Sequence, residues 1–509
     1  MQDGNDALVR LTAVELQQQL QAGALRAVDV TRAFLARIAA IDAGGPRLNA
    51  VIEVNPDAEA SAASLDASFA RSGARGPLHG LPVVLKANID TGDRMATSAG
   101  SLALADHRAQ RDAHLVTRLR AAGAVILGKS NMSEWANFRS TRSTSGWSSL
   151  GGQTRNPHVL DRNPCGSSSG SAVAVAALLA PLAVGTETDG SIVCPAGING
   201  IVGIKPTVGT VSRGGMIPIA HTQDTAGPMA RTVCDAALLL QVMIGHDPQD
   251  AGASAYPHPP PRLLPDPLKR RLDGLRIGVY RSYSGGGRFE NVDAVYQRSI
   301  EQLATLGATL VDPIEYVVAP ECSAAEFQLM RYEFRRGLND YLAAAGLPDD
   351  RNTLTRIIAW NRAHAHRVMP HFGQEILEAA DAMGDLDEPG YRQALAEGPH
   401  RLRAELAALL AEHQLDALVT VTNAFAWKTD WLGGDRFTVG SSTLAAMSGF
   451  PSVTVPAGDV SGLPVGVAWI GAPFAESLLL QIAYAFEQAT QARREPRFVP
   501  TLETDAAGR

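Results

Sequence analysis

The sequence predicts an α/β protein with a central mixed β-sheet covered by helices on both faces. Short apolar runs rich in β-branched residues alternate with amphipathic helical patterns, which is typical of this fold class. The chain has 509 residues, of which 45% are hydrophobic and 19% charged. That composition, with a mean hydropathy of −0.02, supports one large globular domain or two smaller ones.

The N-terminal part begins with helices. Thr12 and Glu15 form a capping-box pattern at the start of the first helix, and Gly23 is its expected end. A second amphipathic run predicts a helix over about 29–43.

Strands and helices then alternate. The apolar runs LNAVIEV (48–54), LPVVL (81–85) and AVIL (124–127) predict strands, and the patterns at 58–70 and 113–122 predict helices. Alternation of this kind predicts a largely parallel or mixed sheet.

The second half of the chain also alternates between expected strands and helices, after a break. A proline-rich stretch at 247–267 predicts a linker or a surface crossing. Long helices are expected between about 323 and 413. Further strands are expected at 275–280, 417–421, 452–456 and 465–471.

Charge and hydropathy argue against two classes of partner. A net charge of −7 with a pI near 6.0 disfavours nucleic acids and anionic membranes, which both bind basic surfaces. The N-terminus has no apolar signal-peptide region, and no apolar run reaches the ~18 residues of a membrane span. We expect a soluble protein, either cytoplasmic or a mature exported form whose leader has been removed.

The cysteines and histidines indicate no metal or cofactor site. Four cysteines without CxxC spacing predict neither a disulfide framework nor a zinc site. Cys165 and Cys194 flank serine-rich stretches, and we interpret both as small buried apolar residues rather than nucleophiles. His364 and His366 are expected to be a pair on a helix surface.

Two motif matches fit their usual chemistry poorly. Residues 123–130 satisfy the Walker A pattern, but the apolar run lies between the glycines instead of before them. A nucleotide-binding protein is therefore a distant alternative. Gly166-x-Ser168-x-Gly170 matches the nucleophile elbow of α/β-hydrolases, yet a polar, proline-broken loop precedes it instead of a buried strand.

Three other segments together indicate serine chemistry. Lys86 ends an apolar strand, CGSSSGSAVAVAALLA (165–180) is a serine loop running into an apolar helix, and Ser191 stands alone in a glycine-rich turn. A serine nucleophile needs a neighbouring base, and no histidine–aspartate pair is evident. Burial can lower a lysine pKa from ~10.4 toward ~7–8, which makes lysine a candidate base.

These segments resemble the amidase signature family, whose hallmark is a Ser-cisSer-Lys triad. The serine loop, GTETDGSIV (185–193), GIKPTVGTVSRGGMIP (203–218) and the sequence from 445 to 471 carry the resemblance. It implies one domain over 1–509, with a catalytic core at about 75–245 and 415–495. A less family-like helical insertion is expected at about 245–415.

The resemblance also implies roles for single residues. Ser191 is the expected nucleophile, Ser167 the bridging serine after a cis peptide bond, and Lys86 the base. Backbone N–H groups of Thr188, Asp189, Gly190 and Ser191 are the expected oxyanion hole. Ser168 is expected to support the loop or the triad, and Asn137 to contact substrate.

This chain departs from the usual family pattern at three positions. Glu187, Asp189 and Val193 stand where the family usually has aspartate, glycine and arginine. The Asp189 carboxylate is expected to face away from the oxyanion hole or to hold N–H groups of the substrate.

The expected reaction is hydrolysis of the C-terminal amide of a peptide through an acyl-enzyme, without a cofactor. The wider agreement, including SEWANFRS and SGWSSLGGQTRNP, resembles family members with this activity. A broader aliphatic or aryl amidase and a component of an amidotransferase stay open, as does an inactive binding protein of the same fold. A monomer is compatible with the sequence, which leaves the oligomeric state open.

Overall fold

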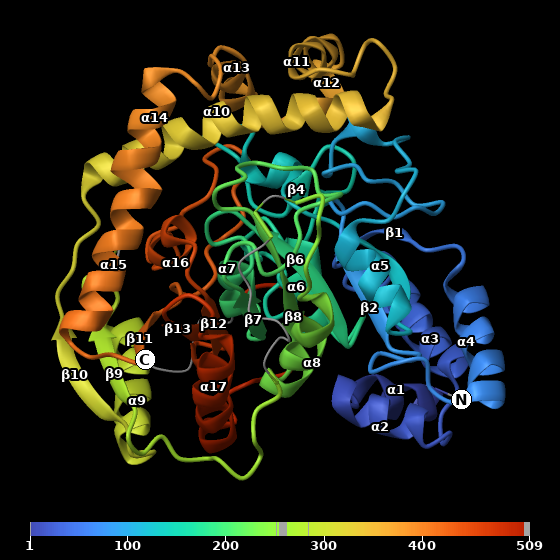
Figure 1. The fold of residues 1–509 in the computed structure, drawn as a ribbon. Coiled ribbons are helices and arrows are strands. Elements are labelled where there is room, and N and C mark those ends of the chain that lie inside the picture. Colours follow the sequence, from blue (N-terminus) through green and yellow to red (C-terminus); the bar gives the residue numbers. More distant parts are fainter. Residues whose placement is uncertain (1, 251, 254–261, 284, 503–509) are drawn as a thin grey trace, which may run out of the picture.

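An eleven-stranded mixed sheet runs through the computed structural model, which describes residues 2–250, 252–253, 262–283 and 285–502 (Figure 1). The strand order is β1-β3-β2-β6-β8-β7-β12-β13-β11-β9-β10. The strands are β1 (Val51–Val54), β2 (Pro82–Lys86), β3 (Val125–Ser130), β6 (Leu182–Glu187), β7 (Val202–Lys205), β8 (Thr225–Ala230), β9 (Arg276–Tyr280), β10 (Thr309–Ile314), β11 (Ala417–Val421), β12 (Ser452–Val460) and β13 (Leu463–Ile470). A separate two-stranded ribbon joins β4 (Trp147–Ser148) to β5 (Gly152–Gln153).

Parallel and antiparallel pairs coexist, which confirms the predicted mixed sheet. Strand β2 is parallel to both β3 and β6, and β9 is parallel to both β10 and β11. The antiparallel pairing of β7 with β12 joins the strands of the two halves of the chain into one sheet. The expectation of a single domain stays a prediction.

Helices pack around this sheet. The N-terminal half contains α1 (Gln2–Arg10), α2 (Ala13–Gln21), α3 (Ala27–Arg37), α4 (Ala58–Ser72), α5 (His114–Ala121), α6 (Ser169–Ala176), α7 (Val193–Ile198) and α8 (Val233–Met243). The C-terminal half contains α9 (Glu290–Thr305), α10 (Pro320–Ala345), α11 (Leu354–Ala363), α12 (Ala365–Val368), α13 (Glu375–Asp381), α14 (Pro389–Leu395), α15 (Arg401–Glu412), α16 (Thr443–Ser448) and α17 (Glu476–Thr490).

Local sequence signals correctly predicted the helices at the N-terminus. Thr12 caps α2 through the predicted capping box with Glu15, and Gly23 follows the helix with a φ of 69°. The helix expected over 29–43 is α3, continued by a π-helical segment over 38–43. Strand β10 was not predicted, because this edge strand is largely exposed and lacks a continuous apolar run.

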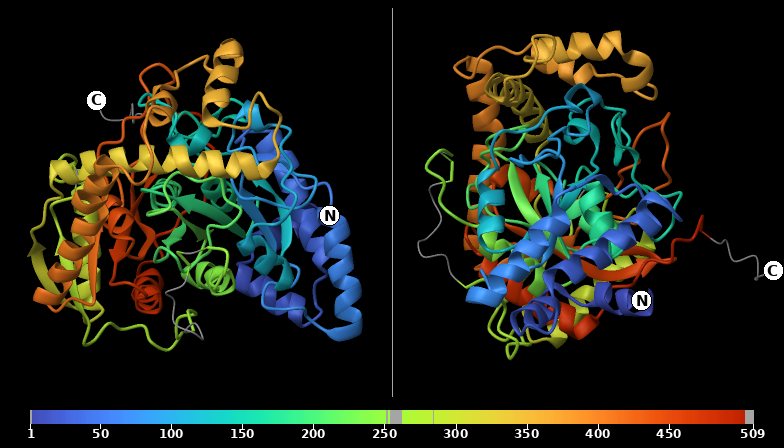
Figure 2. Two further views of the ribbon diagram at one scale, coloured as in Figure 1. Left: turned by 45° about the horizontal axis from the view of Figure 1, so that its top comes forward. Right: turned by 90° about the vertical axis from the view of Figure 1, so that its right-hand side faces the viewer.

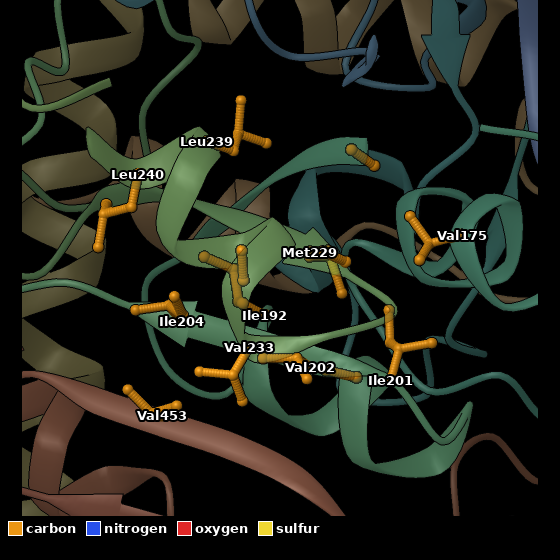
Figure 3. Packing of buried hydrophobic residues seen from close by; sticks show 14 of the residues in the cluster. Val175, Ile192, Ile201, Val202, Ile204, Met229, Val233, Leu239, Leu240 and Val453 are labelled. Atoms are coloured by element: carbon orange, nitrogen blue, oxygen red, sulfur yellow. The ribbon is translucent and has the colours of Figure 1, made fainter. Parts of the chain in front are cut away.

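The core lies between the central strands and the helices that cover them. Figure 3 shows Ile192 beside Ile204 and Val202, together with Leu239 and Leu240 of α8. All five side chains belong to one buried apolar cluster. Ile192 directly follows Ser191, so this packing anchors the end of the turn between β6 and α7.

The helical insertion forms an arch over one edge of the sheet. In Figure 1, α10 crosses the top of the molecule, and α14 and α15 descend on one side. Figure 2 shows the same helices from two further directions, with the long α10 lying across the edge in the left view. His364 lies between α11 and α12, where its ring stacks on Trp360 with centroids 4.0 Å apart.

The interpretation of the cysteines was wrong in one respect. Cys165 and Cys194 are buried, as expected, but they form a disulfide across a sequence separation of 29 residues. Helix α7 packs close to the serine loop, which brings the two Cα atoms to 6.2 Å. Cysteine spacing carries no information about that packing.

The lengths and hydropathies of the described helices were compared with those of a membrane span. Among the residues that the structure describes, none of the helices combines the length and the apolar character needed to cross a bilayer.

Candidate active site

Lys86 lies at the carboxyl end of β2, beside the carboxyl end of the parallel strand β6. The register pairs Leu85 with Val184, so Lys86 lies level with the residues that follow Val184. Carboxyl ends of neighbouring parallel strands meet at one edge of a sheet. That edge collects the predicted site residues, and α10 crosses above it in Figure 1.

The Lys86 ammonium group is buried and makes three hydrogen bonds. Its Nζ donates to Ser167 Oγ at 2.8 Å, to Thr186 Oγ1 at 2.8 Å and to the Thr186 carbonyl at 3.0 Å. The side chain is inaccessible to solvent. Sequence reasoning therefore placed Lys86 and Ser167 together correctly but missed Thr186.

Burial lowers the pKa of Lys86 to about 7. Desolvation is the dominant cause, and the negative charges of Asp224 and then Glu187 partly offset it. A substantial fraction of Lys86 is consequently neutral near pH 7, and a neutral lysine can accept a proton.

The serine loop places Ser167 beside Lys86, two residues before the start of α6. The Gly166–Ser167 peptide bond is cis, and Ser167 is inaccessible to solvent. Ser168 Oγ donates to the Thr186 carbonyl at 3.0 Å and accepts from the Thr186 N–H at 3.2 Å. The loop then enters α6 at Ser169 without a preceding strand, unlike a nucleophile elbow.

Ser191 lies in the turn between β6 and α7. The Ser168 N–H donates to the Ser191 carbonyl at 3.2 Å, which joins this turn to the serine loop. Glu187 accepts the N–H groups of Ile192 at 2.7 Å and Val193 at 3.0 Å, which holds the start of α7. Burial raises the pKa of Glu187, and the positive charge of Lys205 partly offsets this effect.

The predicted oxyanion hole has available donors. Within the described part of the chain, the backbone N–H groups of Thr188, Asp189, Gly190 and Ser191 donate to no other residue. The Ser191 hydroxyl likewise makes no hydrogen bond to a described residue. Ser191 is 8% exposed, whereas Lys86 and Ser167 are inaccessible to solvent.

Asp189 faces the C-terminal half of the chain. Its carboxylate accepts hydrogen bonds from the hydroxyls of Ser442 and Thr443, at 2.8 Å for Thr443. This is the first of the two orientations that the sequence left open, with the carboxylate turned toward α16. Burial raises the pKa of Asp189.

Two further residues complete the surroundings. Asn137 donates to Ser145 Oγ at 3.0 Å, and its Oδ1 is buried without a partner among the described residues. Asp224 accepts from Thr188 Oγ1 at 2.6 Å, and burial raises its pKa to about 6. Sequence reasoning missed Asp224, which lies outside the segments quoted above for the family resemblance.

The Walker-like segment has an ordinary structural role. Helix α5 ends before Gly123, and Gly128, Lys129 and Ser130 are residues of strand β3. Lys129 is inaccessible to solvent and donates to the Ile89 carbonyl. Because these residues form a strand, they do not make the loop that surrounds a phosphate in a Walker A motif.

Comparison with known proteins gives one family match and several similar proteins. Residues 29–480 match the family described as Amidase. The chain is 47% identical to the peptide amidase of Stenotrophomonas maltophilia, with a TM-score of 0.91 over 96% of this chain and 99% of that structure. It is 38% identical to a probable amidase of Arabidopsis thaliana, over 90% of this chain and 86% of that relative. It is 36% identical to a component of the glutamyl-tRNA(Gln) amidotransferase of Moorella thermoacetica, over 96% and 98% respectively.

Proposed function

This chain belongs to the amidase family and is a serine amidase, and on that basis we propose that it hydrolyses the C-terminal carboxamide of peptides. The products are ammonia and a peptide with a free carboxylate. The observation that carries the proposed mechanism is the buried Lys86, whose pKa is about 7 and whose Nζ lies 2.8 Å from Ser167 Oγ.

In the proposed reaction, Ser191 attacks and Ser167 relays protons. Neutral Lys86 accepts the Ser167 proton while Ser167 takes the proton of Ser191, whose Oγ bonds to the carbonyl carbon. The relay then returns a proton to the amide nitrogen, the C–N bond breaks and ammonia leaves. Water attacks the acyl-Ser191 ester along the same relay and releases the acid.

The turn after β6 supports stabilisation of the tetrahedral intermediates. The free N–H groups of Thr188, Asp189, Gly190 and Ser191 are suited to bind the negative oxygen. Loss of one such donor typically costs ~3–4 kcal/mol of transition-state stabilisation. Hydrogen bonds from Ser442 and Thr443 hold the Asp189 carboxylate toward α16, which favours a role for the Asp189 backbone N–H in the oxyanion hole.

Two observations support peptide amides as the substrate class. The similarity to a peptide amidase extends over nearly the whole of both chains. The unpartnered, buried Oδ1 of Asn137 can accept an N–H group from the substrate backbone.

The test is ammonia release from a panel of peptide amides, free peptides and simple aliphatic and aryl amides. Ser191→Ala and Lys86→Met should abolish release, because they remove the nucleophile and the base. Lys129→Met is the matched control, since Lys129 is an equally buried lysine in the neighbouring strand. It should retain activity.

Each proposed element can fail separately. Near-normal release by Ser191→Ala or Lys86→Met would contradict the triad. Equal turnover of simple amides would indicate a broader amidase. An isolated chain that turns over no peptide amide would favour a role within an amidotransferase, which needs a partner.

A further inference from the structure

Gln223 lies between the turn that carries the proposed oxyanion hole and helix α10 of the arch. Its side chain is inaccessible to solvent. The Nε2 atom donates to the Thr188 carbonyl at 3.3 Å and to Glu326 Oε1 at 2.8 Å. An amide nitrogen carries two hydrogens, so both donors of Gln223 are used. One buried side chain therefore connects the catalytic turn to the insertion.

Thr188 is held at two of its atoms. Its Oγ1 donates to Asp224 Oδ1 at 2.6 Å, and its carbonyl accepts from Gln223. The N–H groups of Ile219 and Ala220 donate to Asp224 Oδ2 at 2.8 and 2.9 Å, and the Gln223 N–H donates to the Ala220 carbonyl at 3.0 Å. The segment 219–224 is thus braced by its own hydrogen bonds and holds Thr188 from one side.

The Thr188 carbonyl and the Asp189 N–H belong to the same peptide group. This peptide bond is trans, so the carbonyl and the N–H point in opposite directions in one rigid plane. A contact that fixes the direction of the carbonyl therefore also fixes the direction of the N–H. The Asp189 N–H donates to no described residue and is one of the proposed oxyanion-hole donors.

Helix α10, which crosses the top of the molecule in Figure 1, supplies the second partner of Gln223. Glu326 and Glu333 lie seven residues apart on this helix, which is about two turns, and both are buried. Glu326 accepts from Gln223, and Glu333 accepts from the N–H and the hydroxyl of Thr222, both at 3.0 Å. Two neighbouring residues of the segment are therefore bonded to one face of α10.

The contact between Glu326 and Gln223 does not require a charge on Glu326. Burial raises the pKa of Glu326 well above its usual range, the charge of Asp189 raises it further, and the hydrogen bond from Gln223 partly offsets both effects. A neutral carboxyl group still has an oxygen that can accept from Gln223, and so does the amide of a glutamine.

We propose that Gln223 is a positioning residue, which aims the Asp189 N–H at the oxyanion by fixing the Thr188 carbonyl, and that Glu326 of α10 holds Gln223 in place. This inference rests on the proposed reaction, because that reaction supplies the negative oxygen. It gives the helical arch a part in catalysis through Gln223. A well-aimed donor stabilises the transition state more than the bound substrate, so its loss should lower kcat more than it raises KM.

The test compares a peptide amide with the peptide aldehyde that has the same side chains. Ser191 Oγ bonds to the aldehyde carbon and its proton passes to the relay, which leaves the former carbonyl oxygen negative in the oxyanion hole. Gln223→Met should lower kcat and kcat/KM equally, by about tenfold to hundredfold, since misaiming one donor costs less than the ~10²–10³ of losing it. The affinity for the aldehyde should fall by a similar factor, while KM stays near its wild-type value.

Two variants of Glu326 test the link to the arch. Glu326→Met removes the acceptor and should lower kcat in the same direction as Gln223→Met. Glu326→Gln keeps an acceptor oxygen and should retain most of the activity. This pair decides the proposal even if Gln223→Met does not fold. Gln374→Met is the matched control, because Gln374 is a buried glutamine of the arch that donates to the Ile358 carbonyl at 3.1 Å. It should keep the wild-type kcat and aldehyde affinity.

A wild-type kcat in Gln223→Met would overturn the assignment, as would a loss of kcat without a loss of aldehyde affinity. Equal losses in Glu326→Met and Glu326→Gln, or the same loss in Gln374→Met, would also overturn it. Failure of the proposed reaction gives a different result, because the aldehyde would then bind Ser191→Ala as tightly as the wild type. If the wild-type enzyme prefers a non-peptide acyl group, the amide and the aldehyde are both made with that group.

Discussion

Lys86 combines complete burial with three hydrogen-bond acceptors, and this setting decides its protonation. Desolvation favours the neutral amine, while the charge of Asp224 favours the ammonium form. The balance leaves the pKa at about 7, so the base is available at neutral pH without a histidine. Arginine could not replace it, because arginine does not lose its proton in proteins.

We predict that kcat/KM for a peptide amide rises with pH through a midpoint near 7, as Lys86 loses its proton. Asp224→Asn should move this midpoint to lower pH, because it removes the negative charge that raises the Lys86 pKa. The pH–rate profile of ammonia release measures both effects.

The control for this prediction is Asp42→Asn. Asp42 is also a buried carboxylate with a pKa raised to about 6, but it accepts from the N–H groups of Ala50 and Val51 instead of facing the site. A midpoint that does not move in Asp224→Asn, or that moves equally in Asp42→Asn, would contradict the assignment.

At the scale of the elements, two turns at one edge of the sheet create the site. The parallel register of β2 and β6 brings Lys86 to Thr186, and the hydrogen bond from Ser168 to Ser191 joins the serine loop to the start of α7. The disulfide between Cys165 and Cys194 connects the same two segments covalently. The hydrogen bond and the disulfide therefore hold Ser167 and Ser191 in one region, and the strand register adds Lys86 to it.

We predict that Cys165→Ala/Cys194→Ala lowers the free energy of unfolding by about 3 to 4 kcal/mol, the entropy expected for closing a loop of this length. Urea denaturation with and without a reductant measures the loss. The reductant should lower the stability of the wild-type protein and leave the double variant unchanged.

Cys234→Ala serves as the control, since Cys234 is a free cysteine. Its stability should respond to the reductant as the wild type does. A double variant as stable as the oxidised wild type would show that the disulfide contributes nothing to the fold.

At the scale of the whole molecule, hydrogen bonds from the buried Arg139 attach the helical arch to the core. Arg139 is inaccessible to solvent and lies 2.9 Å from Glu134. It also donates to the carbonyls of Val368, Phe372 and Gly373 in the segment before α13. One side chain thus joins the loop that contains Asn137 to the insertion.

We predict that Arg139→Met lowers the free energy of unfolding by ~3–5 kcal/mol, because Glu134 is left buried and unpaired. Arg362→Met should cost under ~1 kcal/mol, since the Arg362–Glu378 pair is exposed. Urea denaturation of the two variants compares them directly, and similar losses would contradict this assignment.

Much of the fold followed from local patterns. The capping box at Thr12 and the apolar runs that became β2, β9, β11 and β13 depend only on neighbouring residues. The edge strand β10 escaped prediction because its exposed side chains give no periodic signal. For the candidate site, resemblance to the family motifs identified Lys86, Ser167 and Ser191. The sequence assigned no catalytic role to Thr186 or Asp224.

The sequence by itself determined the α/β class, the family and the residues proposed for the triad, because short-range periodicity and motif spacing are properties of the chain. Only the tertiary structure decided that Cys165 bonds to Cys194, that Asp189 turns toward α16, and that Gln223 connects Thr188 to Glu326. These features depend on distances between residues far apart in the sequence. The lowered Lys86 pKa depends in addition on how completely the packed fold excludes water.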